Sequence, residues 1–229
     1  IQRVVQVDSQ TVGLELYAGR VGALILSFDP ERARVLIAAK RLGKCIDPTG
    51  FVADLRRILV PGHFLSADQI GLDRIAHLRF ETAEGAKTLI AELMGKHTSL
   101  ILVNPDGRML ASAKWLGKTK ARRPILPGRV YEPPPLDPRP SVLLAADGDD
   151  LRSFEGVSPF LARWIAAVGE DGLALVQQAY RLSRFEPTQS DEGAAYPLSL
   201  VPLGVVCHNV ELYSGAAEEY FSRVQELDE

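Results

Sequence analysis

The segment from Gly107 to Tyr131 combines residue types that could bind an anion. It contains seven basic residues and no acid, although the whole chain of 229 residues has a formal net charge of −3. A local basic surface can bind phosphates while the remainder keeps the protein soluble, so the segment indicates a polyanionic partner; a solvated face without function is the simpler alternative. The basic residues are Arg108, Lys114, Lys118, Lys120, Arg122, Arg123 and Arg129.

A second candidate is an adjacent acid and arginine inside "QIGLDRIAHLRF", residues 69–80. The apolar residues of this stretch alternate as in a strand, but the alternation slips by a step at Asp73 and Arg74. A surface ion pair at a strand kink, worth about 0 to 1 kcal/mol, is one interpretation of the pair. The other interpretation is that the pair binds a ligand, and evidence for it must come from the rest of the chain.

The sequence lacks the common catalytic and metal-binding patterns. No GxxxxGK[ST], GxGxxG, GxSxG or HExxH motif occurs. The histidines never fall at the spacing of three to five that helical or finger metal sites use, and Cys45 and Cys207 have no CxxC partner, so we expect two buried, reduced thiols and no metal or cofactor. A binding protein rather than an enzyme is therefore expected, with RNA or DNA as the first partner to consider.

Hydrophobic periodicity predicts an α+β fold. The first forty residues alternate short apolar runs with turn formers, which is typical of an antiparallel meander. In "DPTGFVADLRRILVPG" the apolar residues recur at helical spacing, so Arg56 and Arg57 should point away from the buried face. Further strand-like pieces follow until "VYEPPPLDPRP", residues 130–140, where five of eleven residues are prolines and we expect a domain boundary.

Beyond the proline-rich segment the patterns change to short helices. Ser158 can cap the helix in "EGVSPFLARWIAAVG", and the preceding Phe-Glu-Gly-Val turn resembles that of a helix-hairpin-helix, whose loop suits a phosphate; an ordinary helical turn is the alternative. Residues 196–207 are strand-like again, as if the chain rejoined the sheet, and an acidic amphipathic helix ends the sequence. We therefore expect a β-rich domain over residues 1–139, an inserted helix-hairpin-helix-like module over 140–192, and a return strand with an acidic helix over 193–229.

The sequence carries no sign of a membrane span or of export. No run of eighteen apolar residues and no basic-then-apolar leader occurs in it. This pattern predicts a cytoplasmic protein without a membrane partner, with the reservation that the sequence begins at Ile1 rather than Met.

Four ordered motifs resemble the N-terminal region of the NFACT family: "FVADLRRILVPG", "QIGLDRIAHLRF", "LIAELMGKHTSLILVNPDGRML" and "RRPILPGRVYEPPP". The family includes bacterial RqcH, also known as FbpA or fibronectin-binding protein, and eukaryotic NEMF. Its members continue into a long coiled coil and a C-terminal RNA-binding domain, so the resemblance implies that this chain is a fragment. It also implies an antiparallel sheet domain similar to the N-terminal domain of formamidopyrimidine-DNA glycosylase.

The resemblance implies a role on the ribosome. Members bind the large ribosomal subunit obstructed by a peptidyl-tRNA and recruit tRNA, alanyl-tRNA in bacteria, so that carboxy-terminal tails of alanine are added to the stalled chain. Asp73 and Arg74 match the family's Asp-Arg pair, which is implicated in tRNA engagement. The planar fork of an arginine fits a phosphate or a base edge, and the neighbouring carboxylate can orient it.

Other residues follow from the same resemblance and from the charge pattern. The "ELMGKH" motif supplies Glu92, Gly95, Lys96 and His97, although a strand-end turn that needs the backbone freedom of glycine explains Glu92 and Gly95 equally well. Further candidate RNA contacts are the arginines Arg56, Arg57, Arg122 and Arg123.

Two competing functions stay open. The name fibronectin-binding protein implies a surface adhesin that binds fibronectin, but no export signal in the sequence supports it. A DNA glycosylase needs a mature N-terminal proline with an adjacent acid, and usually a zinc finger; Ile1, Gln2 and the cysteine pattern do not supply them.

Overall fold

The computed structural model describes residues 1–17, 19, 21–38, 42–43, 45–117, 123–135, 137–211 and 213–228, and the side chains of Val21 and of residues 222–228 lie outside this description. The chain divides into two compact units, Ile1–Leu136 and Asp137–Glu229, and the division falls in the proline-rich segment. The architecture is α+β with antiparallel sheets, which confirms the fold class expected from the periodicity.

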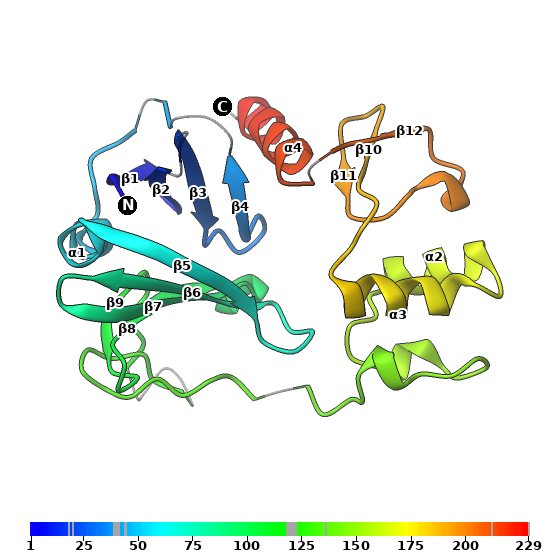
Figure 1. Ribbon diagram of the computed structural model, residues 1–229, viewed down its shortest axis with the longest axis horizontal. Coiled ribbons are helices and arrows are strands. Elements are labelled where there is room, and N and C mark those ends of the chain that lie inside the picture. Colours follow the sequence, from blue (N-terminus) through cyan, green and yellow to red (C-terminus); the bar gives the residue numbers. More distant parts are fainter. Residues whose placement is uncertain are drawn as a thin grey trace. The chain divides into compact units, whose positions relative to one another are not determined.

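The N-terminal unit begins with the predicted meander of four antiparallel strands, whose order in the sheet follows the chain (Figure 1). The turn between the first two strands is closed by Asp8, whose carboxylate accepts a hydrogen bond from the backbone N–H of Gln10 at 2.8 Å. The strands are β1 (Arg3–Asp8), β2 (Thr11–Tyr17), β3 (Val21–Ser27) and β4 (Arg34–Ala38).

A second antiparallel sheet contains five strands, again in chain order. Its first strand, one of its two edges, carries a β-bulge between Phe64 and Ser66, so that Leu65 has no partner on the neighbouring strand. Leu65 is 59% exposed. The strands are β5 (Gly62–Gln69), β6 (Ile75–Thr82), β7 (Gly85–Glu92), β8 (Ser99–Val103) and β9 (Met109–Ser112).

The break expected near Asp73 and Arg74 is present, but it is a hairpin loop between two strands rather than a kink within one strand. β5 ends at Gln69 and β6 begins at Ile75, so residues 70–74 form a hairpin loop. Gly71 has a φ of +57°, a left-handed conformation that favours glycine. The alternation slips because two of its apolar residues, Ile70 and Leu72, belong to the loop rather than to either strand.

The predicted helix is α1 (Gly50–Leu59), which packs against β1, β6 and β9. Its apolar face is buried, whereas Arg56 and Arg57 are exposed, as predicted. A cis peptide bond between Val60 and Pro61 leads into β5. The first residue of β5 must be a glycine, because a Cβ on Gly62 would lie 2.6 Å from the carbonyl oxygen of Leu59.

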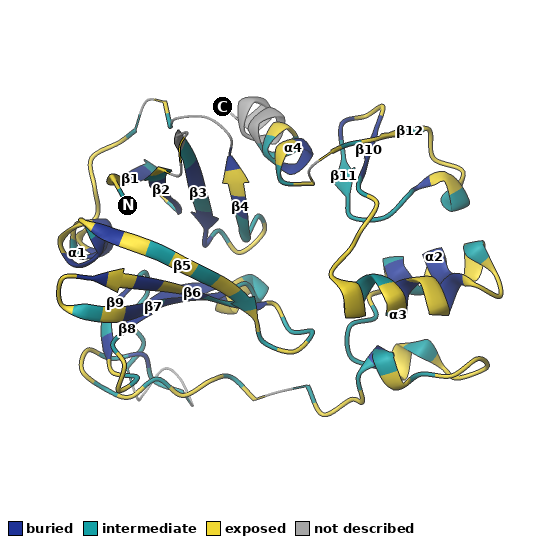
Figure 2. Cartoon of the chain, viewed as in Figure 1, coloured by how far each residue is buried: buried dark blue, intermediate teal, exposed yellow. Residues whose placement is uncertain are grey.

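The main core of this unit joins both sheets and α1. Leu14 and Leu26 contribute from the first sheet, Leu55 from α1, and Phe80 and Leu102 from the second sheet, and all five are fully buried. Figure 2 shows the buried positions along these strands. Full burial of each such side chain contributes about 1.5 to 3 kcal/mol of transfer free energy, so this core determines how the two sheets pack.

The opposite face of the five-stranded sheet is covered by the segment that follows β9. Ile75, Ile90 and Ile101 pack there against Ile125, which forms a β-bridge with Leu116. The sheet is thus buried on both faces near β8, and all residues of β8 are buried.

The C-terminal unit contains the helices α2 (Pro159–Val168) and α3 (Gly172–Leu182), which pack against each other. The hydroxyl of Ser158 accepts a hydrogen bond from the N–H of Leu161 at 3.1 Å, which confirms the predicted cap. The element before the Phe-Glu-Gly-Val turn is only the single 3-10 turn η3 (Leu151–Ser153), preceded by another, η2 (Val142–Leu144).

The predicted return strand is wrong. Residues 197–206 contain no strand; Pro202 and Gly204, the latter with a φ of +71°, belong to the 3-10 turn η4 and its C-terminal cap. Proline has no N–H and glycine takes the left-handed conformation, so this apolar run ends in a turn. Three short strands form a separate sheet in the order β11-β10-β12. These elements are β10 (Thr188–Ser190), β11 (Ala195–Tyr196), η4 (Val201–Leu203) and β12 (Cys207–Asn209).

The chain ends in α4 (Tyr213–Asp228), the acidic helix expected from the sequence. No helix in the described ranges is both long enough and apolar enough to cross a membrane.

Candidate functional site

Two loops meet at one end of the five-stranded sheet. Alternate hairpin loops of an antiparallel meander fall at the same end, so the β5–β6 loop lies beside the β7–β8 loop, residues 93–98. A backbone hydrogen bond of 2.8 Å from the N–H of Leu93 to the carbonyl of Arg74 joins them. The β5–β6 loop projects from the right-hand end of this sheet in Figure 1.

Asp73 shapes the β5–β6 loop rather than orienting the neighbouring guanidinium. Its carboxylate accepts a hydrogen bond of 2.8 Å from the backbone N–H of Arg74, and its carbonyl accepts one of 2.9 Å from the side chain of Gln69. The side chain of Arg74 is exposed, and within the described part of the chain its guanidinium has no hydrogen bond or ion pair. Arg74 can therefore present its donors to a ligand.

The β7–β8 loop, joined to the loop of this arginine through Leu93, adds further exposed side chains at the same end of the sheet. It contains the 3-10 turn η1 (Gly95–His97), in which Gly95 has a φ of +54° and Lys96 and His97 are exposed. Glycine is favoured at Gly95 because other residues adopt that backbone conformation only with strain. The turn thus explains Gly95 structurally, whereas Lys96 and His97 extend the exposed surface that begins at Arg74.

Glu92, the last residue of β7, lies beneath these loops with its side chain fully buried. Arg123 binds it with a two-pronged contact, Nη1 to Oε1 at 2.8 Å and Nη2 to Oε2 at 2.5 Å, and the hydroxyl of Tyr131 donates to Oε1 at 2.7 Å. We call Glu92, Arg123 and Tyr131 the Glu92 cluster. A buried carboxylate is stable only when its oxygens accept hydrogen bonds, and this one accepts three.

Contact with Glu92 also shifts the pKa values of its two donors. Burial alone would lower the pKa of Arg123, but the hydrogen bonds and the charge of Glu92 outweigh it and raise the pKa. Burial raises the pKa of the Tyr131 phenol, and the charge and hydrogen bond of Glu92 raise it further. The arginine is also positioned over the Tyr131 ring, 5.7 Å from its centroid. The cluster therefore holds a charged arginine and a neutral tyrosine on one carboxylate.

Two predicted site residues, Glu92 and Arg123, thus contact each other. Arg123 donates a further hydrogen bond of 2.8 Å from Nη1 to the carbonyl of Glu132, and its side chain is 22% exposed. The sequence did not single out Tyr131, although it stands in the same "RRPILPGRVYEPPP" motif as Arg123. That shared motif was the available signal.

The structure does not bring Arg56 and Arg57 to this end of the sheet. Both lie near the end of α1, which leads into the first residue of β5, and the eight residues of β5 span roughly 25 Å before the β5–β6 loop begins. Arg56 donates from Nε to the carbonyl of Val4 at 3.2 Å, and Arg57 is paired with Asp54 at 3.1 Å. Their hydrogen bonds support α1 and β1.

The basic segment is described only in part. Lys118, Lys120 and Arg122 lie outside the described residues. Of the remaining cations, Arg108 donates to the carbonyl of Gly128 at 3.1 Å, and Arg129 lies 3.9 Å from Glu132. Several of the predicted cations therefore serve local structure.

Cys45 and Cys207 are free thiols, as expected, but both are half-buried rather than buried. Within the described ranges no three His, Cys, Asp or Glu side chains are grouped so as to hold a metal ion.

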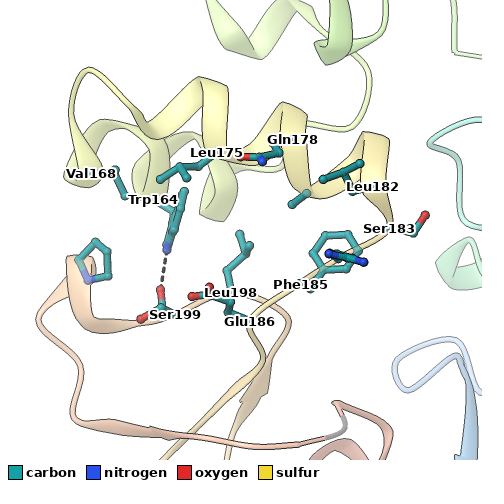
Figure 3. A pocket seen from close by; sticks show the side chains of 13 residues that line it. Trp164, Val168, Leu175, Gln178, Leu182, Ser183, Phe185, Glu186, Leu198 and Ser199 are labelled. Atoms are coloured by element: carbon teal, nitrogen blue, oxygen red, sulfur yellow. Dashed lines mark hydrogen bonds between the residues drawn. The ribbon is translucent and has the colours of Figure 1, made fainter.

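A different kind of site occurs in the C-terminal unit. A cavity of about 820 Å³ is walled by Trp164 from α2, Leu182 from α3, and Phe185 and Leu198 from the segments that follow (Figure 3). The Trp164 indole donates a hydrogen bond of 2.6 Å to the carbonyl of Ser199, which fixes one wall. The cavity is mainly apolar, and no residue proposed from the sequence lines it.

Comparison with known proteins gives the following likenesses. The family model for "NFACT N-terminal and middle domains" matches residues 1–172. The Rqc2 homolog RqcH of Bacillus subtilis (strain 168) is 32% identical over 178 residues, which cover 68% of this chain and 31% of that protein. The archaeal Rqc2 homolog aRqcH of Methanocaldococcus jannaschii is 31% identical over 93 residues, 40% of this chain and 13% of that protein. The chain thus spans less than a third of these curated relatives.

Solved structures share the fold. The N-terminal part of the fibronectin/fibrinogen-binding protein of Streptococcus suis superposes with a TM-score of 0.79 at 21% identity, covering 97% of this chain and 91% of that one. The fibrinogen binding protein of Staphylococcus aureus gives 0.76 at 20% identity, covering 96% and 91%.

Proposed function

The chain belongs to the NFACT family, and we propose that its N-terminal unit is an RNA-binding module that engages tRNA at the end of the five-stranded sheet. The module acts by binding, without a catalytic step of its own. Peptide transfer is left to the ribosome.

One observation carries this proposal: the free guanidinium of Arg74 lies in a loop that is hydrogen-bonded to the loop carrying the exposed Lys96 and His97. An arginine without an internal partner can donate its forked pair of N–H groups to a phosphate or a base edge. The hydrogen bond between Leu93 and Arg74 keeps both loops together, so that the three side chains act on one ligand.

The predicted contacts then divide by role. Arg74, Lys96 and His97 contact RNA, and Asp73 fixes the loop that carries Arg74. Glu92 is buried and does not reach the ligand. Arg122 remains a predicted contact that the structure does not describe.

At the level of the whole protein we propose a ribosome-associated quality control factor. The relatives named Rqc2 homologs support this class. In that setting the partners are the obstructed large ribosomal subunit and a tRNA, alanyl-tRNA in a bacterial protein, and the product is a carboxy-terminal alanine tail on the stalled chain. This setting is cytoplasmic.

Two finer fold assignments also belong to the proposal. One is the similarity of the N-terminal unit to formamidopyrimidine-DNA glycosylases. The other is a helix-hairpin-helix-like role for residues 140–192. The positive φ of Gly156 in the Phe-Glu-Gly-Val turn and the capped start of α2 support this role. The element before the turn is the 3-10 turn η3 rather than a full helix.

Binding of fibronectin or fibrinogen is the second candidate, because structural neighbours carry those names. Their identity to this chain is about a fifth, so the likeness concerns the fold. Immobilised fibronectin tests this candidate directly: saturable binding that Arg74→Ala leaves unchanged would favour it over RNA binding.

The main test is a salt titration of tRNA binding by the 229-residue chain and its Arg74→Ala variant. We expect Arg74→Ala to raise the Kd by about 5- to 150-fold, which corresponds to about 1 to 3 kcal/mol, and to lower the salt slope by about 1. Arg57→Ala is the matched control, because Arg57 is exposed but already paired with Asp54. Equal Kd values for the wild type and a folded Arg74→Ala variant would refute the assignment.

A further inference from the structure

The Glu92 cluster lies directly beneath the proposed RNA contact, and the chain connects the two. We infer that Arg123 and Tyr131 are positioning residues for RNA binding, which act on Arg74 through Glu92 without touching the ligand. This inference rests on the proposed function.

Glu92 depends on its two hydrogen-bond partners. Its carboxylate is fully buried, and its three side-chain hydrogen bonds come from Arg123 and Tyr131. Removing a donor leaves a buried carboxylate oxygen with an unmet hydrogen bond, so the carboxylate must move or admit water. The two donors therefore hold the end of β7 together with its pairing to β6 and β8.

The backbone connects Glu92 to Arg74. Glu92 is the direct cross-strand partner of Ile75, the residue after Arg74. The next residue, Leu93, donates its N–H to the carbonyl of Arg74 at 2.8 Å. A displacement of the Glu92 backbone is thus transmitted to both sides of the Arg74 peptide unit.

Both donors come from one anchored segment, residues 123–131. Arg123 also binds the carbonyl of Glu132, and Ile125 between the two donors is buried against Ile90 and Ile101. The segment is held by apolar packing as well as by the hydrogen bonds. It can therefore serve as a fixed support against which Glu92 is held.

This arrangement differs from the direct contact that the charge pattern suggested for Arg123. The Nη1 and Nη2 groups of its guanidinium are occupied by Glu92 and Glu132, so an RNA phosphate would have to compete with a buried carboxylate for them. A residue that acts through another should lose its effect on binding when that other residue is removed. That expectation separates positioning from both direct contact and general stability.

The experiment is a double-mutant cycle in tRNA affinity. The Kd is measured for the wild-type chain, Tyr131→Phe, Arg74→Ala and the double variant, with the melting temperature of each protein followed by circular dichroism. We expect Tyr131→Phe to raise the Kd by about 3- to 30-fold in the wild type and by less than about twofold in the Arg74→Ala background.

Arg123→Lys is the second variant, because it keeps the charge but loses the two-pronged contact. We expect it to change the Kd in the same direction and with the same dependence on Arg74. Arg56→Lys is the matched control: Arg56 lies near the end of α1, away from the β5–β6 and β7–β8 loops, and its Nε donates to the carbonyl of Val4 at 3.2 Å. It should change stability and leave the Kd as in the wild type.

The outcomes are distinguishable. An unchanged Kd for Tyr131→Phe and Arg123→Lys, or equal effects in both backgrounds, would overturn the inference while the loss caused by Arg74→Ala upholds the proposed function. If Arg74→Ala itself leaves the Kd unchanged, both are overturned.

Discussion

The Glu92 cluster and the cavity of the C-terminal unit are held together by different kinds of contact. In the cluster, each polar group has a specific partner at hydrogen-bond distance around one buried carboxylate. The cavity is bounded mainly by apolar side chains, of which Leu175 and Leu182 are 46% and 54% exposed. A buried charge therefore depends on every partner, because each unmet hydrogen bond is costly, whereas an apolar wall distributes its contacts over many atoms.

Removal of Arg123 should have the largest effect on stability. Arg123→Ala leaves Glu92 buried without its cation, and we expect the free energy of unfolding to fall by about 3 to 5 kcal/mol. Urea denaturation of Arg123→Ala and of a control variant, Arg57→Ala, measures this loss. Arg57→Ala, which removes an exposed ion pair, should cost about 0 to 1 kcal/mol. Similar losses for both arginines would mean that burial of the carboxylate does not control stability.

The tryptophan of the cavity provides an intermediate effect. Trp164→Phe keeps an aromatic wall but removes the donor to the Ser199 carbonyl, so we expect a loss of about 1 to 2 kcal/mol. Leu182→Ser in the same cavity should change the unfolding free energy by less than about 0.5 kcal/mol, because that side chain is half exposed. Thermal melts followed by the near-ultraviolet signal measure both. A larger loss for Leu182→Ser than for Trp164→Phe would contradict this account of the cavity.

The smallest expected effect is a pH dependence confined to the N-terminal unit. Burial, and then the charge of Arg79, lower the pKa of His77, although the carboxylates of Asp68 and Glu92 act in the opposite direction. The folded state therefore favours neutral His77: this stabilisation is complete above the unfolded value near 6.5 and decreases as the pH falls through the range down to the folded pKa.

The check for this dependence is a comparison of variants at several pH values. His77→Gln should flatten the loss of stability between about pH 7 and 5, whereas His63→Gln, at an exposed position of β5, should retain it. Parallel pH curves for the wild type and His77→Gln would refute the assignment to His77.

Local patterns predicted the elements that short-range spacing determines. The meander, α1 and the Ser158 cap depend on residues within a few positions of each other, and they were found where expected. The break near Asp73 and Arg74 was predicted, but its extent as a hairpin loop over residues 70–74 was not, because two apolar loop residues imitate a strand. The run at residues 196–207 was misread because Pro202 and Gly204 override its hydrophobicity with backbone constraints.

The candidate site was harder to predict because its decisive contacts are long-range. Arg123 and Tyr131 stand 31 and 39 residues from Glu92 along the chain. No local periodicity encodes such a pairing, and a positive charge in a basic segment reads the same whether it faces solvent or a buried acid. The exposure of Arg74, by contrast, follows from its position in the β5–β6 loop.

The bulge at Leu65 has a consequence for how copies of the protein behave toward one another. β5 is an edge of its sheet, and a straight edge strand offers a row of backbone groups with which another chain can pair. The extra residue interrupts that row and increases the local twist, which makes intermolecular strand addition unfavourable even though an exposed leucine stands there. We therefore expect the irregularity of β5 to disfavour aggregation through this edge.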